Sequence, residues 1–486
     1  MINTTKFFVI LMAASLLLGF SGENPDTQEP TPIDILAAYI HEAKYGDFPE
    51  EVTNRAKYLI LDSIGCALGG TQLDLGKDYL KLGKNWPGGS EATLIGTGTR
   101  VSLLNAAYVN SQLANVLDFD DTYDLYAPGH PGCGIVQTAL AAAEAKGVSG
   151  LDLLTAVILG YEICLRMGRA EGPFDWQSPI FVDTMTRGTA AVAARLFGLT
   201  QAEIVTALRH AAEQPPGRRQ KFDVPADMVI PEIKSNYGLY AIKGILAVRL
   251  AQQRIEGWES VLQGNLKKWY FAGGEIENYR ELTEGLGHVY RLMEVSFKPT
   301  PTCRLTHAPI TALWEALDHQ PLKSEDVTEI IIKGVERLNR PEWETWLQAQ
   351  FSMQCAAALA ASGTEPGPGW YTTGRFNDPD IKELAGKVKL ENDPEAEELE
   401  IKALKVKCSV QVKLKDGTVK EATIYHIKGA PGNPLTDKEL RAKFRANTGD
   451  ILAEDRIETI IDRVLNLEKL PRAATLTQML VSPKLK

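Results

Sequence analysis

The sequence predicts a mostly α-helical protein that also contains a smaller α+β domain. Apolar residues recur at helical spacing from about Ile33 to Ala251. Near Tyr290 the pattern changes to segments that alternate in polarity or are rich in β-branched residues, which is typical of strands. Helical spacing returns from Asp437 onward. Together these observations favour a helical bundle with a mixed segment in the second half of the chain.

The expected helices of the first half carry apolar residues three and four positions apart. Glycines stop several of them, as Gly69, Gly70 and Gly198 do. Runs of alanine and glycine along these segments allow close helix–helix approach, which suits a buried bundle. The expected helices cover residues 33–45, 52–68, 101–117, 135–145, 151–167, 188–197, 201–212 and 237–253.

The mixed segment contains one isolated strand pattern and one hairpin pattern. Residues 328–335 are rich in β-branched side chains. Residues 403–414 alternate in polarity, turn at the Asp-Gly pair 416–417 and return over residues 418–427, which predicts a hairpin. The remaining helix patterns cover residues 307–317, 350–361, 437–445 and 456–467.

Length and charge bound the class of protein. A chain of 486 residues is long for one core, so two domains are expected. Lys and Arg number 52 against 62 Asp and Glu, and the net charge of −10 lacks the basic footprint of a nucleic-acid binder. Part of the acidic excess lies in residues 391–400, which we expect to form a solvated loop.

The N-terminus predicts export. Lys6 precedes an apolar run over residues 7–20, small residues follow it, and a polar stretch leads to Pro32. This pattern is typical of a secretory signal peptide over residues 1–22, so we expect a periplasmic or secreted protein. The alternative is an uncleaved membrane anchor. No other stretch of the sequence is apolar for long enough to span a bilayer, so no stable membrane insertion is expected after cleavage.

The sequence predicts no metal and no cofactor. Its six cysteines are widely spaced and form no CxxC pair, so neither a disulfide framework nor a zinc or iron–sulfur site is expected. Cys66 and Cys164 lie in apolar helical context, where a buried thiol is the expected state.

The densest group of acid–base side chains lies at residues 118–123 (DFDDTY) and 129–132 (GHPG). If the first stretch is helical, Asp118, Asp121 and Thr122 share one face with Asn115, and Asp120 points elsewhere. Acidic groups on an inward face, opposite a histidine on the next loop, are able to transfer protons. The alternative is a helix C-terminus with a solvated acidic end.

Basic side chains lie near two expected helix starts. His130 precedes Pro131, which is favoured at the first position of a helix, so the imidazole is expected beside an anion-binding helix N-terminus. Lys234 precedes candidate N-caps of the helix that starts near Tyr237. Lys298 lies in an extended segment that also holds Arg304 and His307. A single lysine is usually a solvated surface residue, but the combination indicates a small polycarboxylate substrate.

These residues carry a family resemblance. The chain resembles the MmgE/PrpD family, which includes 2-methylcitrate dehydratase, cis-aconitate decarboxylase and iminodisuccinate epimerase. The resemblance runs from about Ile33 to Leu467, and the DFDDT and HPG motifs are its most specific parts. Further support comes from the segments LDSIGCALGG at residues 61–70, GTAAVAARLFGL at residues 188–199 and FKPTPTCRLTH at residues 297–307.

The resemblance implies a fold and a chemistry. The fold is a large all-helical domain formed from both ends of the chain, at residues 31–292 and 431–480, with an inserted α+β lid at residues 293–430. Such enzymes are metal-free and handle protons next to a carboxylate by side chains alone. The family commonly forms homodimers, so a homodimer is expected here.

The resemblance also implies residue roles. His130 matches the acid–base histidine, Asp118 and Thr122 match the acid and the hydroxyl of the motif, and Lys234 matches a further catalytic lysine that holds a substrate carboxylate. The expected substrate-binding residues are Lys298, Cys303 and His307. Three departures indicate a changed pocket: Tyr237 stands where the family has histidine, a second histidine is missing near Pro179, and Cys355 replaces a tyrosine.

The leading hypothesis is therefore a cofactor-independent lyase that acts on a small polycarboxylate, with dehydration as the first-ranked reaction. Decarboxylation and epimerisation remain open, because all three begin from similar carbanion chemistry. The competing hypothesis is an exported protein that binds a polycarboxylate without turnover. A third is a helical scaffold without a ligand.

Overall fold

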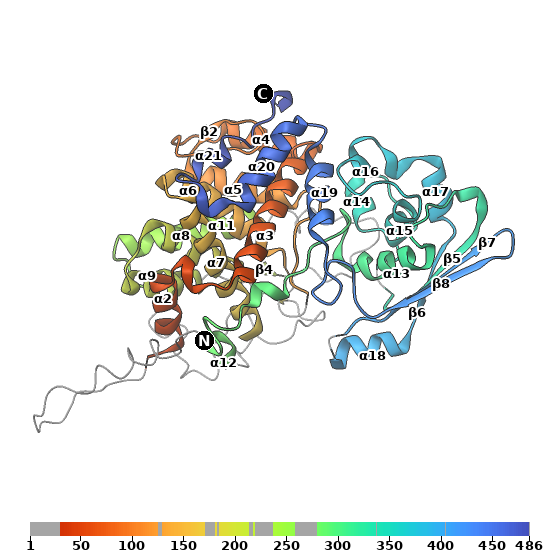
Figure 1. Cartoon of the computed structure of the whole chain (residues 1–486), viewed down its shortest axis with the longest axis horizontal. Helices are drawn as coiled ribbons and strands as arrows, with labels where there is room; N and C mark the ends of the chain where they lie inside the picture. Colours follow the sequence, from red (N-terminus) through yellow and green to blue (C-terminus); the bar gives the residue numbers. More distant parts are fainter. Residues whose placement is uncertain are drawn as a thin grey trace, which may run out of the picture.

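The computed structural model describes residues 30–124, 129–170, 180–181, 184–212, 217–218, 237–257, 279–336, 338–403 and 405–485. The chain is mostly helical and has a small mixed sheet, as the sequence predicts (Figure 1). The expected signal peptide lies outside the described residues, so export stays a prediction. Within the described ranges, no helix combines the length and the apolar character that a membrane crossing requires.

The first half of the chain forms a helical bundle. Its long helices agree with the predicted segments to within a few residues at most ends, because each has an apolar face that packs against its neighbours. The sequence did not predict α4, whose exposed face is polar. The helices are α2 (Pro32–Glu42), α3 (Glu50–Gly70), α4 (Asp74–Asn85), α5 (Leu103–Asn115), α6 (Pro131–Lys146), α7 (Gly150–Ala170), α8 (Met185–Phe197), α9 (Gln201–Ala212), α11 (Tyr237–Gln252) and α12 (Arg280–Thr283).

Small residues allow the central helices to approach closely. A Cβ atom on Gly160 of α7 would lie 2.4 Å from Val192 Cγ2, and one on Gly188 of α8 would lie 2.8 Å from the Gly160 carbonyl oxygen. Both distances are shorter than a packed core tolerates, so only glycine fits at this crossing. The alanine- and glycine-rich pattern therefore has the predicted cause.

The last helices return to the bundle. Helices α19 (Asp437–Thr448) and α20 (Glu454–Leu465) pack beside α3, and α21 (Ala474–Thr477) follows them (Figure 1). Phe444 of α19 lies against Gly65 of α3, where an added Cβ would be 2.9 Å from its ring. One hydrophobic cluster contains buried residues from 33–297 and from 435–480.

The mixed segment contains a four-stranded sheet, whose strands lie in the order β6-β5-β7-β8. Strand β5 pairs in parallel with β6 and antiparallel with β7, and β7 and β8 form the predicted hairpin around Gly417. A second hydrophobic cluster lies mainly between the sheet and its helices and also includes Cys66, Leu73, Val116, Leu117 and Phe119. The strands are β5 (Val327–Gly334), β6 (Val388–Asn392), β7 (Cys408–Leu414) and β8 (Val419–Ile424), and the helices are α13 (His307–Leu317), α14 (Trp346–Gln350), α15 (Met353–Ala361), α16 (Gly369–Thr372), α17 (Pro379–Ala385) and α18 (Pro394–Ala403).

The predicted loop at residues 391–400 is wrong. Strand β6 ends at Asn392, and α18 begins at Pro394, a residue favoured in the first turn of a helix. The expected exposure is correct for most of these residues. Helix α18 lacks a wide apolar stripe, and Ala396 is its buried apolar residue among those whose burial is described, so periodicity does not reveal it.

Short two-residue strands complete the fold. Strands β1 (Ala92–Thr93) and β2 (Arg100–Val101) pair antiparallel before α5, and β3 (Ile180–Phe181) pairs antiparallel with β4 (Gly217–Arg218).

Candidate active site

The segment after α5 is a turn, so the helical case considered for residues 118–123 does not apply. Helix α5 ends at Asn115, whose carbonyl accepts a hydrogen bond from the Asp118 N–H at 2.8 Å. Asp118 has a φ of +51°, the left-handed region, which ends any continuation of the helix. The condition for a shared helical face of Asp118, Asp121 and Thr122 is therefore not met.

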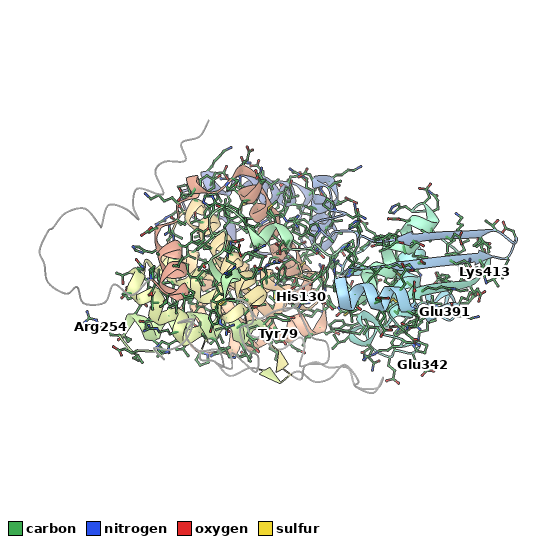
Figure 2. The ribbon with its side chains drawn as sticks, turned by 90° about the horizontal axis from the view of Figure 1, so that it is seen from below. Tyr79, His130, Arg254, Glu342, Glu391 and Lys413 are labelled. Atoms are coloured by element: carbon green, nitrogen blue, oxygen red, sulfur yellow. The ribbon has the colours of Figure 1, made fainter. Side chains whose placement is uncertain are left out.

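The turn presents Asp118 and Asp120 to His130. The Nε2 atom of His130 lies 3.5 Å from Oδ1 of Asp118, and its Nδ1 atom lies 3.3 Å from Oδ2 of Asp120. Both carboxylates are buried, whereas the imidazole keeps 15% of its side-chain surface exposed. His130 thus has the access to solvent or ligand that its two neighbours lack. Figure 2 shows His130 near the middle of the molecule, far from Glu391 and Lys413 at the end of the sheet.

Asp120 is a candidate site residue that the helical case placed on another face. Its carboxylate accepts hydrogen bonds from Nδ2 of Asn115 at 3.0 and 3.3 Å. Burial raises the pKa of Asp120. The His130 imidazole and the Lys298 ammonium lower it by more, so the pKa of this carboxyl group lies below its usual range. Asp120 is therefore an anion beside the imidazole. Reading Asp-Phe-Asp as an alternating segment would have placed it correctly.

Helix α6 positions His130. His130 is its N-cap residue and Pro131 its first residue, as predicted. Gly132 has no room for a side chain, because a Cβ atom would lie 2.4 Å from Oδ1 of Asp121 and 2.7 Å from the Tyr161 hydroxyl. The His-Pro-Gly motif therefore fixes the point at which the helix begins and the imidazole leaves the backbone.

Asp121 binds the start of α6. Its carboxyl group accepts hydrogen bonds from the Gly132 N–H at 2.9 Å and from the Tyr161 hydroxyl at 2.7 Å. Burial raises the pKa of Asp121 to about 8, and the negative charges of Asp120 and Asp62 raise it as well. The hydrogen bonds from Tyr161 and Gly132 lower it by less. Asp121 is thus a structural neighbour of the acid–base cluster.

Lys298 joins the cluster from the other side. Its fully buried ammonium group lies 2.6 Å from Oδ1 of Asp118, and it donates to the carbonyls of Asp118 at 2.9 Å and Thr302 at 3.4 Å. These three acceptors match the three N–H donors of a lysine. Direct binding of a substrate carboxylate by Lys298 would require at least one of these bonds to break.

The other predicted residues lie as follows. The Thr122 hydroxyl donates to Asp124 at 3.3 Å, and the Thr122 backbone pairs with Ser296. His307 is fully buried with its ring nitrogens 3.2 Å from the carbonyls of Arg304 and Thr300, and burial lowers its pKa well below the usual range. Cys303 is half-buried, and its N–H donates to Gln350. Lys234 lies outside the described residues.

An ion pair ties the site turn to the segment before α13. Arg304 donates two hydrogen bonds to the Asp124 carboxylate, at 3.0 and 2.7 Å, and the Ser296 hydroxyl donates to the same group at 2.7 Å. Together with the Asp118–Lys298 pair, these bonds hold residues 118–124 against residues 296–304. The sequence analysis had named Arg304 only as a nearby cation.

Tyr237, which the resemblance places where the family has a histidine, contacts His130. It is the first residue of α11, and its buried ring lies edge-on to the His130 imidazole with centroids 5.5 Å apart. Such an arrangement is favourable for two aromatic rings and limits rotation of the imidazole.

The acid–base residues also offer metal-ligand atoms. One ligand atom each from Asp118, Asp120 and His130 lies within 4.8 Å of the others. Carboxylate and imidazole groups of this kind suit several divalent ions. However, the Lys298 ammonium already contacts Oδ1 of Asp118, so a cation would have to displace a buried positive charge.

A mostly helical fold that places an imidazole between two buried carboxylates has the acid–base groups that an enzyme of proton-transfer chemistry uses. Sequence comparison gives the family. Residues 34–277 match the MmgE/PrpD N-terminal domain, and residues 300–467 match the MmgE/PrpD C-terminal domain. The chain belongs to the MmgE/PrpD family, as the motifs predict.

Similar proteins cover nearly the whole chain. It is 28% identical to the cis-aconitate decarboxylase of Mus musculus over 472 residues, which cover 92% of this chain and 93% of the relative. It is also 28% identical to the Homo sapiens cis-aconitate decarboxylase over 92% of this chain and 94% of the relative. It is 25% identical to the cis-aconitate decarboxylase of Aspergillus terreus, over 90% of this chain and 93% of the relative.

Proposed function

We propose that this protein is a cofactor-independent lyase that decarboxylates cis-aconitate or a closely similar unsaturated polycarboxylate. The observation that carries the proposal is the imidazole of His130, which is partly exposed and lies between Asp118 and Asp120. The cis-aconitate decarboxylases that align with nine tenths of the chain support the choice of reaction. Dehydration, the reaction that the sequence ranked first, becomes the second candidate.

Decarboxylation needs a proton donor. The bond between a carbon and its carboxylate breaks, carbon dioxide leaves, and the electron pair spreads over the neighbouring double bond and its remaining carboxylate. A proton must then be delivered to carbon. His130 is the partly exposed acid–base group of the described cluster, so it is the proposed donor of this proton.

The charges of the cluster fit this role. Asp118 and Asp120 carry two negative charges and Lys298 carries one positive charge, which leaves a net charge of −1 before His130 is counted. A proton on His130 makes the cluster neutral. The two negative charges therefore favour an imidazolium as the proton donor, and Oδ2 of Asp120 lies 3.3 Å from its Nδ1 atom.

The negative charges of Asp118 and Asp120 also disfavour a substrate carboxylate close to His130. Asp118 and Asp120 repel anions, so the reacting carbon and not a carboxylate is expected to face His130. The carboxylates need cations or N–H groups elsewhere. Lys234, whose role stays a prediction, is one candidate for such a cation. Lys298 becomes a positioning residue for Asp118 in this proposal.

A panel of acids tests the proposal. The full chain is incubated with cis-aconitate, with citrate-like hydroxy acids and with chiral dicarboxylic acids, and carbon dioxide and products are measured. We expect carbon dioxide from cis-aconitate with the unmodified protein and at most a trace with His130→Gln. Water loss from a hydroxy acid without carbon dioxide would favour dehydration, and inversion of a chiral acid would favour epimerisation. Affinity without turnover would favour a binding protein.

Three further expectations stay proposals. The first is a division into residues 31–292 with 431–480 and an inserted domain at residues 293–430, which is supported by a second hydrophobic cluster whose members lie mostly at residues 310–424. The second is a homodimer, which light scattering on the purified chain tests. The third is export through residues 1–22, which N-terminal sequencing of the mature protein tests.

A further inference from the structure

Phe119 lies between the two carboxylates that flank His130, and its carbonyl group has an unusual partner. Lys443 of α19 donates to this carbonyl at 2.6 Å, across 324 positions of the sequence. The ammonium group also lies 4.1 Å from the centre of the Phe119 ring. A residue near the end of the chain therefore contacts the centre of the acid–base turn.

A buried ion pair holds this lysine. Its Nζ atom lies 2.5 Å from Oδ1 of Asp62 on α3, and both side chains are at most 5% exposed. Burial opposes the charge of each partner and raises the pKa of Asp62, whereas the Asp62 carboxylate raises the pKa of Lys443. We regard the pair as charged, because the ammonium group also has the Phe119 carbonyl and the Phe119 ring around it.

Two lysines thus hold successive carbonyl groups of one turn. Lys298 donates to the carbonyl of Asp118, and Lys443 donates to the carbonyl of Phe119. The turn contains Asp118 at φ +51°, a conformation that persists in a non-glycine residue only where surrounding contacts fix it. The two contacts on adjacent peptide groups provide this restraint.

We propose that Lys443, paired with Asp62, is a positioning residue for the active site. By holding the Phe119 carbonyl, it keeps Asp118 and Asp120 on the two sides of the His130 imidazole. Lys443 does not contact the reacting groups itself. Its effect on turnover rests on the proposed function above, but its effect on the geometry around His130 does not.

The test compares two variants that differ in one donor. Asp62→Asn keeps Lys443 and its N–H bond to Phe119. The double variant Asp62→Asn/Lys443→Met also removes this donor, and it leaves no unpaired buried charge that would unfold the protein. If the double variant does not fold, Asp62→Leu/Lys443→Met replaces it with an apolar pair. Lys57→Met is the control, because Lys57 forms another largely buried ion pair, with Glu468 at 2.8 Å.

Two measurements separate positioning from simple stabilisation. The first is kcat and KM on cis-aconitate. The second is the imidazole signal of His130 in NMR spectra, assigned with His130→Gln among the seven histidines, which needs no substrate. We expect the double variant to lose about tenfold or more in kcat relative to Asp62→Asn, with KM changed less, and to shift the His130 signal.

Three outcomes would overturn the proposal. The first is a double variant that folds and has the same kcat and the same His130 signal as Asp62→Asn. Another is an equal fall in kcat in Lys57→Met. If the unmodified protein turns over no acid in the panel, the proposed function fails, and an unchanged His130 signal in the double variant then overturns the positioning role separately.

Discussion

The ammonium group of Lys298 and the imidazole of His130 meet at one atom, Oδ1 of Asp118, at 2.6 and 3.5 Å. Lys298 belongs to the segment before α13, and His130 begins α6. Asp118 therefore joins the helical bundle to the start of the mixed segment at the acid–base site. The geometry of this one carboxylate determines what the imidazole faces, and the predictions below follow from it.

Removal of Lys298 is expected to impair both stability and turnover. Lys298→Met leaves the Asp118 carboxylate buried without its cation, which costs roughly 3–5 kcal/mol in the free energy of unfolding. Chemical denaturation and kcat measure the two effects. The double variant Asp118→Asn/Lys298→Met should recover much of the stability without recovering kcat. A single variant with unchanged stability and kcat would contradict the role of Lys298.

A methyl group at position 132 is expected to disturb the start of α6. In Gly132→Ala the new Cβ would collide with Asp121 and Tyr161, and such overpacking costs about 1–3 kcal/mol. The melting temperature should fall, and kcat should fall with it because His130 is two residues away. Gly46→Ala is the matched control, since a Cβ there has nothing within 4 Å. Equal effects of the two substitutions would show that crowding at Gly132 is not the cause.

The free energy of unfolding is expected to decrease as the pH rises, because Asp121 ionises. Its folded pKa of about 8 lies above the value of about 4 for an unfolded aspartate. The folded state therefore holds a proton that the unfolded state has lost, and this stabilisation is complete below about pH 4 and lost as the pH rises through 8.

Unfolding measured from pH 5 to 8 tests this dependence. In Asp121→Asn, the slope should decrease by up to about 1.4 kcal/mol per pH unit. Part of the slope should remain, because burial also raises the pKa of Glu162, to about 7. A slope in Asp121→Asn that equals that of the unmodified protein would refute the prediction.

Turnover is expected to survive removal of metal ions. The Lys298 ammonium provides the positive charge beside Asp118 that a divalent ion would otherwise supply. Dialysis against EDTA followed by the cis-aconitate assay should leave kcat unchanged. Loss of activity that one divalent ion restores would mean that Asp118, Asp120 and His130 bind metal in the working enzyme.

Local patterns predicted the elements with a clear apolar face or a specific turn. Helix α13 has the predicted bounds, and the β7–β8 hairpin turns at Gly417, where φ is +91°. Helix α18 was missed because an exposed acidic helix has little apolar periodicity.

The site was predicted in part. Pro131 predicted that His130 lies at a helix start, and the DFDDT motif predicted Asp118 as a site residue. Asp120 was not among the predicted site residues, because a helical reading of residues 118–122 points it elsewhere and periodicity does not reveal the left-handed Asp118 that ends the helix. The contact of Lys443 with Phe119 depends on the packing of α19 against α3, which no local pattern encodes.

The most direct test of the account is carbon dioxide release from cis-aconitate by the unmodified protein, His130→Gln and Asp120→Asn. If His130 delivers the proton and Asp120 orients it, the first variant should retain little activity, and the second should lose about 10²-fold or more in kcat while remaining folded. Turnover by folded His130→Gln at the rate of the unmodified protein would contradict the central claim.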